Sequence, residues 1–208
     1  MNSKKSILIA GCEGLIGKTT SKLFSQKGWN VIGFDIDLDT EGNEYVDRYI
    51  PCNIKDYALV EKTISDIEQK YAIDAVFNTA GYEINTLFEE TPTIFWQQLL
   101  DTILGGSANL CRAAAPYMVK RKHGKIILLC ADYNYADGDN VMNAAAFGTL
   151  HGFAKSFGTE MAPENVLVNV LSANVPFEAD IIAETVFYLA DKDTYTSAQV
   201  VSVSGKSL

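Results

Sequence analysis

Short apolar segments alternate with longer amphipathic ones along the chain, and this alternation restricts the fold more than any other feature. Seven segments have the length and apolar content of buried strands, namely Ser6–Ala10, Asn30–Asp35, Tyr45–Ile50, Ala75–Thr79, Lys125–Cys130, Val166–Leu171 and Gln199–Ser204. Several are almost continuous apolar runs, which is typical of a parallel sheet with helices on both faces. The pattern therefore predicts a doubly wound α/β fold, in which a seven-stranded parallel sheet lies between two helical layers.

The amphipathic stretches between the strands predict those helical layers. We expect helices over Leu15–Lys27, Lys55–Tyr71, Thr93–Lys120, Asn143–Met161 and Asp180–Ala190. Gly28 is a plausible C-cap for the first helix, and Gly105 and Gly106 are a candidate break in the long third one. The chain has 208 residues and no linker rich in Pro, Gly or Ser, so we expect a single domain.

Charge and cysteine content argue against several classes of protein. The formal net charge is −9, and an acidic chain repels phosphate backbones, so nucleic-acid binding is not expected. No apolar run approaches the roughly 18 residues of a membrane span, and the apolar run near the N-terminus is too short for a signal peptide. The four cysteines are widely spaced and there are two histidines, which argues against disulfides and a metal site. We therefore expect a cytoplasmic protein with reduced thiols.

Three glycines form the motif Gly11-Cys-Glu-Gly14-Leu-Ile-Gly17 between the first predicted strand and the first predicted helix. Glycine there lets backbone N–H groups approach a pyrophosphate, and the helix N-terminus adds unpaired donors and a positive dipole end. Asp35 ends the second strand, where a carboxylate accepts hydrogen bonds from both hydroxyls of an adenosine ribose. It would repel a 2′-phosphate, and Ile36 offers no compensating cation. The motif therefore predicts a site for NAD(H) rather than NADP(H); the alternative is a tight turn that binds nothing.

These residues and three later stretches make the chain resemble the short-chain dehydrogenase/reductase family over almost its whole length. The later stretches are Cys52-Asn-Ile54, Asn78-Thr-Ala-Gly81, and Val166–Leu171 followed by Gln199-Val-Val-Ser-Val-Ser-Gly205. The resemblance implies a Rossmann fold, and it implies that Asn53 contacts the adenine amino group and that Asn78, Ala80 and Gly81 form the floor under the adenine ribose. The cofactor site predicted in this way comprises Gly11, Gly14, Leu15, Ile16, Gly17, Asp35, Ile36, Asn53, Ile54, Asn78, Ala80 and Gly81.

The resemblance ends at the positions that carry the family's chemistry. That chemistry needs a tyrosine acid whose pKa is lowered by a lysine four residues later, a serine that polarises the carbonyl, and an asparagine that holds a relay water. The family's helix pattern aligns with Gly152, Ser156, Phe157 and Glu160. This register places Asn143 at the tyrosine and Phe147 at the lysine. Cys130, or alternatively Ala131, stands at the serine, and Ile103 at the asparagine. We therefore predict no catalytic residues.

Two further departures concern the substrate and the cofactor. In the family, a Pro-Gly turn after the sixth strand lies against the nicotinamide, and here that turn is Ala173-Asn174. Only Val175 to Ala179 then precede the last helix, so the segment that covers the substrate is nearly absent. Replacing the lysine by Phe147 also removes a hydrogen-bond partner of the nicotinamide ribose. A charged hydrogen bond contributes about 1.5–3 kcal/mol, so we expect a dinucleotide to be held by its adenosine half with weakened affinity.

A replacement active site is the main alternative to a missing one. Tyr133 and Tyr135 follow the fifth strand, but the segment from Ala131 to Asn143 contains acids and no cation that would lower a phenol pKa. Cys130 ends an apolar strand, where a thiol is usually inert. The pair Tyr188 and Lys192 has the family's spacing, but it lies at the end of the last predicted helix and is a chance match.

Small residues form a stripe along the helix predicted over Asn143–Met161. Ala144, Gly148, Gly152 and Ser156 recur every four residues and therefore share one face. Each glycine costs about 1 kcal/mol relative to alanine in a helix, which suggests that another backbone packs closely there. The resemblance implies a four-helix bundle between subunits, built from this helix and Thr93–Lys120. The alternative is packing against the protein's own sheet.

Three hypotheses follow for the function. The leading one is a non-catalytic subunit with an NAD(H) adenosine and pyrophosphate site, in a homo-oligomer or in a hetero-oligomer with a catalytically complete relative. The second is an NAD(H)-dependent oxidoreductase with a rearranged site around Tyr133 or Tyr135. The third is a scaffold subunit that binds no nucleotide, which Glu13 favours because a carboxylate in the glycine loop repels a pyrophosphate unless it points away.

Overall fold

The computed structural model describes residues 4–36, 43–132, 141–174, 177–192 and 194–204. The strands are β1 (Ser6–Ala10), β2 (Asn30–Asp35), β3 (Arg48–Pro51), β4 (Ala75–Asn78), β5 (Gly124–Asp132), β6 (Val166–Asn174) and β7 (Val200–Val203). The α-helices are α1 (Leu15–Gln26), α2 (Tyr57–Glu68), α3 (Thr93–Leu100), α4 (Gly106–Arg121), α5 (Val141–Met161) and α6 (Ala179–Asp191). Short 3₁₀ turns lie at Phe88–Glu90 and Ala162–Glu164.

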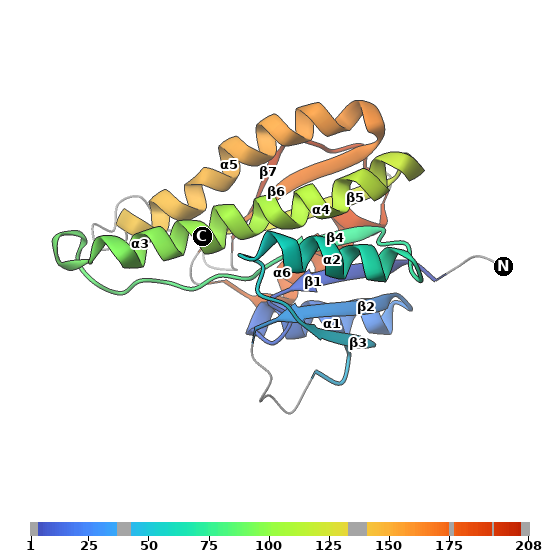
Figure 1. Ribbon diagram of the computed structural model, residues 1–208, viewed down its shortest axis with the longest axis horizontal. Coiled ribbons are helices and arrows are strands. Elements are labelled where there is room, and N and C mark those ends of the chain that lie inside the picture. Colours follow the sequence, from blue (N-terminus) through green and yellow to red (C-terminus); the bar gives the residue numbers. More distant parts are fainter. Residues whose placement is uncertain (1–3, 37–42, 133–140, 175–176, 193, 205–208) are drawn as a thin grey trace.

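The strands form a single sheet in the order β3-β2-β1-β4-β5-β6-β7, and every neighbouring pair is parallel. The order reverses direction between β1 and β4, the point at which open α/β sheets bind ligands beyond the carboxyl ends of their strands. The predicted seven-stranded Rossmann-type sheet is therefore confirmed (Figure 1).

Two apolar cores lie on opposite faces of the sheet, and β1 contributes to both. Leu8 and Ala10 face the core that is covered by α2, α4 and α5, whereas Ile7 and Ile9 face the core under α1 and α6. All four side chains are completely buried. The alternation explains why β1 reads as a continuous apolar run, and it gives the three layers visible in Figure 1.

Helix α1 ends as its sequence predicts. Gly28 has a φ of +84°, and its N–H donates to the carbonyl of Ser25. The Trp29 N–H donates to the carbonyl of Phe24. These two bonds form a Schellman motif, in which the residue after the cap takes a left-handed conformation that glycine adopts without strain.

Several predicted boundaries need correction. The third strand was expected over Tyr45–Ile50, but Asn43 accepts the Tyr45 N–H and forms a turn, so β3 begins at Arg48. The strands β5 and β6 are longer than expected because they pair over nine residues each. The helix α2 begins at Tyr57, two residues later than expected, because Asp56 caps it by accepting the Leu59 N–H. The long third helix does not break at Gly105; a π-helical turn, Asp101–Gly105, joins α3 to α4.

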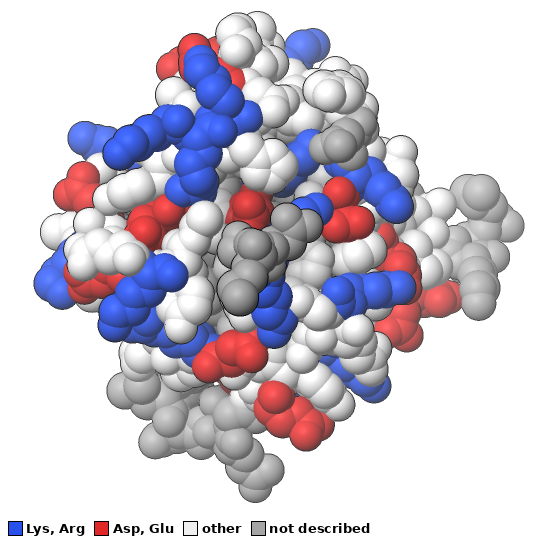
Figure 2. Space-filling model, turned by 90° about the vertical axis from the view of Figure 1, so that its right-hand side faces the viewer, with Lys and Arg blue, Asp and Glu red and all other residues white. Residues whose placement is uncertain are grey.

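The charges at the end of the molecule where β1 starts are mixed. Figure 2 shows basic and acidic side chains interspersed over this face. Several pair there or nearby, including Lys5 with Asp191, Arg121 with Glu68, and Lys122 with Glu164. No helix within the described ranges is long and apolar enough to cross a membrane.

Candidate functional site

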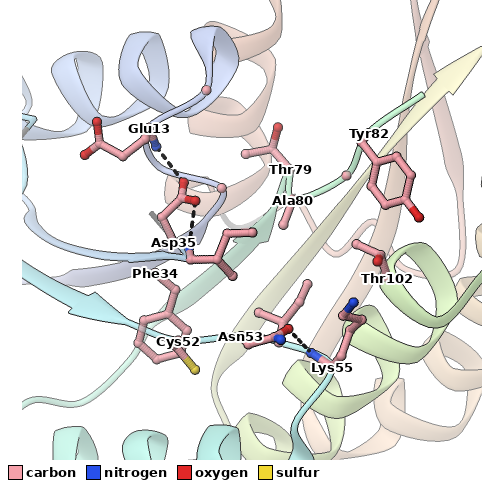
Figure 3. Close-up of a pocket in the computed structure, with 15 residues that line it drawn as sticks. Glu13, Phe34, Asp35, Cys52, Asn53, Lys55, Thr79, Ala80, Tyr82 and Thr102 are labelled. Carbon is pink, nitrogen blue, oxygen red and sulfur yellow. Dashed lines mark hydrogen bonds between the residues drawn. The ribbon is translucent and has the colours of Figure 1, made fainter. Parts of the chain in front are cut away.

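A cavity of about 500 Å³ lies at the carboxyl ends of β1 to β4 (Figure 3). Its described lining residues come from the turns that follow these strands and from the start of the π-helical turn before α4. They are Gly11, Glu13, Gly14, Phe34, Asp35, Ile36, Cys52, Asn53, Ile54, Lys55, Thr79, Ala80, Gly81, Tyr82 and Thr102. The cavity therefore occupies the crevice where the sheet order reverses.

Close backbone contacts explain two of the three glycines. Gly11 has a φ of +81°, and a Cβ placed on it would lie 2.8 Å from the Ala80 nitrogen. A Cβ on Gly17 would lie 2.0 Å from the Gly11 carbonyl oxygen. The loop thus folds back on the start of α1 and packs against the turn after β4. Gly14 is the N-cap, and the first turn of α1 contains no acidic residue, which leaves the N-terminal donors of this helix suited to an anion.

Asp35 connects the end of β2 to the glycine loop. One of its carboxylate oxygens accepts the Glu13 N–H at 3.0 Å, and the other accepts the Ile36 N–H at 2.8 Å. Each oxygen keeps a second lone-pair site for a further donor. The Glu13 side chain points away from the cavity (Figure 3), and its carboxylate lies 3.2 Å from the Lys18 ammonium group. The charge of Glu13 is therefore paired outside the cavity, which removes the repulsion expected from its position in the motif.

Two isoleucines provide apolar surfaces at the cavity. Ile36 is 71% exposed, although it is a large apolar side chain, and Ile54 is 5% exposed. Asn53 also lines the cavity, and its side-chain oxygen accepts the Lys55 N–H at 3.1 Å. This combination of apolar faces and one amide is the kind of surface that a flat heteroaromatic base requires.

The predicted cofactor residues divide into two groups. Gly11, Gly14, Asp35, Ile36, Asn53, Ile54, Ala80 and Gly81 line the cavity, whereas Leu15, Ile16, Gly17 and Asn78 are not part of the lining. Asn78 is 4% exposed and acts beneath the cavity: it donates to Ser107 and accepts the Ala80 N–H. It therefore ties β4 to α4 and holds the turn that carries Ala80.

Sequence reasoning missed several lining residues. Lys55 and Tyr82 directly follow predicted site residues, so extending each motif by one position would have found them. Thr102 had no such signal, because it lies on a helix far along the chain. In the structure, the Lys55 side chain extends toward Thr102 (Figure 3). Burial raises the pKa of Tyr82, and the neighbouring Thr102 hydroxyl partly offsets this.

The residues aligned with the family's catalytic groups do lie close together. A Cβ placed on Gly81 would be 2.7 Å from Ile103 Cδ1 and 3.5 Å from Phe147 Cζ. The Cys130 thiol lies 3.5 Å from the Phe147 carbonyl oxygen. Ile103 and Phe147 are 2% and 8% exposed. Hydrocarbon thus packs against the back of Gly81.

Asn143, aligned with the catalytic tyrosine, is completely buried. Its side-chain oxygen accepts the Ile84 N–H at 2.9 Å, and its side-chain nitrogen donates to the Ile84 carbonyl at 3.0 Å. Both bonds fasten the chain that follows β4 to α5. The amide therefore has a structural task where a catalytic phenol would need access to substrate.

The cavity thiol is poorly suited to nucleophilic chemistry. Burial raises the pKa of Cys52 to about 11, so the thiol stays protonated at neutral pH. Tyr133 and Tyr135, the candidates for a rearranged site, lie outside the described residues. The substrate-covering segment expected to be nearly absent corresponds to the short connection between Asn174, the last residue of β6, and Ala179, the first of α6.

Comparison with known proteins decides the family. A model of the short chain dehydrogenase family matches residues 5–178. The chain belongs to the short-chain dehydrogenase family. Among similar curated proteins, the 3-oxoacyl-(acyl-carrier-protein) reductase FabG of Thermotoga maritima is 26% identical, over 97% of this chain and 96% of the relative. An NAD-dependent glycerol dehydrogenase of Listeria innocua is also 26% identical, over 81% of this chain and 70% of the relative.

Solved structures share the fold of this chain. A structure described as ElxO with NADP bound superposes with a TM-score of 0.88, at 18% identity, over 98% of each chain. The alignment with the Thermotoga reductase spans 238 positions, whereas this chain has 208 residues. The relative therefore contains internal segments that have no counterpart here.

The family's dinucleotide fits one half of this site better than the other. The cavity offers a glycine cradle, a carboxylate at the end of β2 and apolar faces, which suit pyrophosphate, ribose and adenine. At the described positions aligned with the catalytic set, Ile103 and Phe147 are hydrocarbon, Asn143 is engaged with Ile84, and the buried Cys130 thiol donates to the Phe147 carbonyl, so these positions suit the nicotinamide half poorly.

Proposed function

We propose that this member of the short-chain dehydrogenase family is a non-catalytic nucleotide-binding subunit of an oligomer. The observation that carries the proposal is the state of the catalytic positions. Phe147 and Ile103 pack together on Gly81, and Asn143 is buried and doubly bonded to Ile84. A phenol acid needs a nearby cation to transfer a proton at neutral pH, and none of these side chains is ionisable.

The proposed ligand is NAD(H) rather than NADP(H). Asp35 lines the cavity, and its negative charge would repel a 2′-phosphate, while its neighbour Ile36 supplies no cation. The similar proteins include both an NAD-dependent dehydrogenase and a structure with NADP bound, so they do not decide between the two cofactors. The preference therefore rests on Asp35 and Ile36. Calorimetric titration with NADH and NADPH tests it: we expect NADH to bind with micromolar affinity and NADPH at least tenfold more weakly. Equal binding would contradict the preference, and no binding of either would favour the scaffold reading.

A turnover assay separates this proposal from the oxidoreductase alternative. The purified protein is incubated with each reduced dinucleotide and a panel of aldehydes, ketones and 3-oxoacyl thioesters, and nicotinamide absorbance is followed. We expect no turnover beyond that of a preparation of Asp35→Ala, which controls for contaminating enzymes. Turnover that is lost in Tyr133→Phe or Tyr135→Phe would establish the rearranged active site instead.

The proposed assembly surface lies on α5 and α4. A Cβ placed on Gly148 or Gly152 would meet no described atom within 4 Å outside the backbone of α5 itself, so these two glycines do not pack on the protein's own sheet. Beside it, half-buried Phe153 and Phe157 stack at 5.6 Å and line an apolar groove between the two helices. Exposed apolar grooves of this kind are typical of interaction surfaces.

One pair of variants tests that surface without confusing assembly with folding. Gly152→Leu has room in the protomer and gains up to about 1 kcal/mol of helix propensity, so its melting temperature should not fall. Its sedimentation coefficient should fall to that of a single protomer. Gly158→Leu is the contrast, because its Cβ would lie 2.8 Å from the Ala198 nitrogen and should destabilise the fold itself. An unchanged sedimentation profile for Gly152→Leu would refute the surface.

A further inference from the structure

The described walls of the cavity belong to one half of the fold. They come from the turns after β1, β2, β3 and β4 and from Thr102, and none of the described lining residues belongs to α5 or to β6. A ligand in this cavity would be contacted at its base, its first ribose and its phosphates. The groups that would contact a second ribose and a second base have to come from the other half.

Behind the cavity wall at that border lies hydrocarbon. Gly81 is a lining residue, and directly behind it lie Ile103 Cδ1 and the Phe147 ring, both almost completely buried. Neither side chain lines the cavity or carries a donor or acceptor. Phe147 therefore cannot give a second ribose the hydrogen bond that the family's lysine provides at this position.

The other end of the cavity is well equipped for a nucleoside diphosphate. Ile36 is 71% exposed beside Asp35, and a base packed on it would cover apolar surface that is otherwise in water. The Asp35 carboxylate retains acceptor capacity for ribose hydroxyls, and α1 presents its N-terminus at Gly14 for phosphate. Affinity should therefore arise from the adenine, the first ribose and the phosphates.

We infer that the site recognises the ADP moiety itself, so that ADP-ribose and ADP bind with affinities similar to that of NADH. This inference rests on the proposed nucleotide site and specifies its ligand class. It departs from what the family implies, since a dehydrogenase must hold the nicotinamide ring for hydride transfer. The protein would then respond to the pool of adenosine diphosphates and not to the redox state of the nicotinamide.

Calorimetric titrations of the full chain with NADH, NAD⁺, ADP-ribose, ADP and nicotinamide mononucleotide test the inference. We expect the dissociation constants of NADH, NAD⁺ and ADP-ribose to agree within about threefold, ADP to lie within tenfold of them, and nicotinamide mononucleotide to give no binding heat. Binding of NADH more than tenfold tighter than that of ADP-ribose, equivalent to 1.4 kcal/mol, would overturn the inference and leave the nucleotide site standing. No binding by any ligand would refute the nucleotide site itself.

A matched pair of variants locates the contacts. Asp35→Ala should weaken NADH and ADP-ribose by the same factor, because both present the same ribose to it. Phe147→Leu keeps the side chain behind Gly81 apolar and should change neither affinity. A selective effect of Phe147→Leu on NADH would show that binding of the nicotinamide half depends on this side of the cavity and would overturn the inference.

Discussion

Replacing Asn143 by alanine tests whether the residue at the tyrosine position has a structural or a chemical task. The change removes a donor and an acceptor that satisfy both backbone groups of Ile84, in a place where Asn143 is completely buried and Ile84 is 9% exposed. An unsatisfied buried polar group costs about 1–3 kcal/mol, so the free energy of unfolding should fall by about 2–5 kcal/mol. At about 2–4 °C per kcal/mol for a chain of this size, the melting temperature should fall by about 4–20 °C.

Circular dichroism during heating measures that loss, and urea titration gives the free energy. Asn109→Ala is the matched control: its amide also donates to backbone carbonyls, those of Ile54 and Lys55, but it is only partly buried, so water can replace the bonds at lower cost. A melting temperature within 1 °C of the parent for Asn143→Ala would refute the structural task. Loss of a measurable turnover with unchanged stability would identify Asn143 as part of an active site.

Other predictions concern charge and pH. Asp35→Ser combined with Ile36→Arg should raise NADPH affinity above that of NADH in calorimetric titration, because a cation replaces the repelling carboxylate. Arg121→Ala should cost about 3 kcal/mol in urea unfolding, since the partner carboxylate of Glu68 is 3% exposed and would be left unpaired. Burial raises the pKa values of Cys12 and Cys111 from about 9 to about 12, so the unfolded thiols ionise first, and the free energy of unfolding in urea should fall as the pH rises from about 9 toward 12, a loss that Cys12→Ala or Cys111→Ala should reduce.

The parts of the fold that the sequence predicts well are those in which local and global signals agree. The bounds of β1 and β2 are correct to the residue, because both strands are apolar, end at glycine or acid, and are covered on both faces. The prediction of β3 is wrong at its start because the decisive signal is one side chain: Asn43 forms a turn where the apolar pattern alone suggests a strand.

The candidate site shows a similar division. Motif spacing brings Gly11, Asp35 and Asn53 to one cavity, since each lies at or just after the carboxyl end of a strand and parallel strands end at the same edge. It does not find Thr102, whose place depends on how the helix before α4 crosses the sheet. Asn78 lies beneath this cavity, where its amide donates to Ser107 and accepts the Ala80 N–H, and its predicted place in the floor under a ribose stays a prediction.

The register assigned to the catalytic helix gains support from contacts that played no part in assigning it. Counting along three separate segments selected Ile103, Cys130 and Phe147. The structure brings Ile103 and Phe147 onto the same glycine, Gly81, and places the Cys130 thiol against the Phe147 carbonyl. Such contacts between residues of three separate elements are what the predicted register requires.

The glycine loop has two explanations, a nucleotide site and a turn that binds nothing, because Gly11 and Gly17 are required by the protein's own packing in either case. Their missing side chains make room for Ala80 and for the Gly11 carbonyl, and this would hold in a scaffold that binds nothing. Gly14 differs. Its φ of −67° and ψ of 164° suit any residue, and a Cβ there would approach no described atom more closely than the Gly11 carbonyl oxygen, at 3.6 Å.

Gly14→Ala therefore separates a nucleotide site from an inherited turn. Alanine is a poorer N-cap than glycine, which costs a fraction of a kcal/mol, so the melting temperature should fall by no more than about 2 °C. If a phosphate lies against this residue, the added methyl group should weaken NADH and ADP-ribose at least tenfold. Gly17→Ala is the contrast, because it should lower the melting temperature as well as the affinity. Gly14→Ala that binds both ligands with parental affinity would mean that no phosphate approaches the loop, and the glycine motif would then be explained by packing alone.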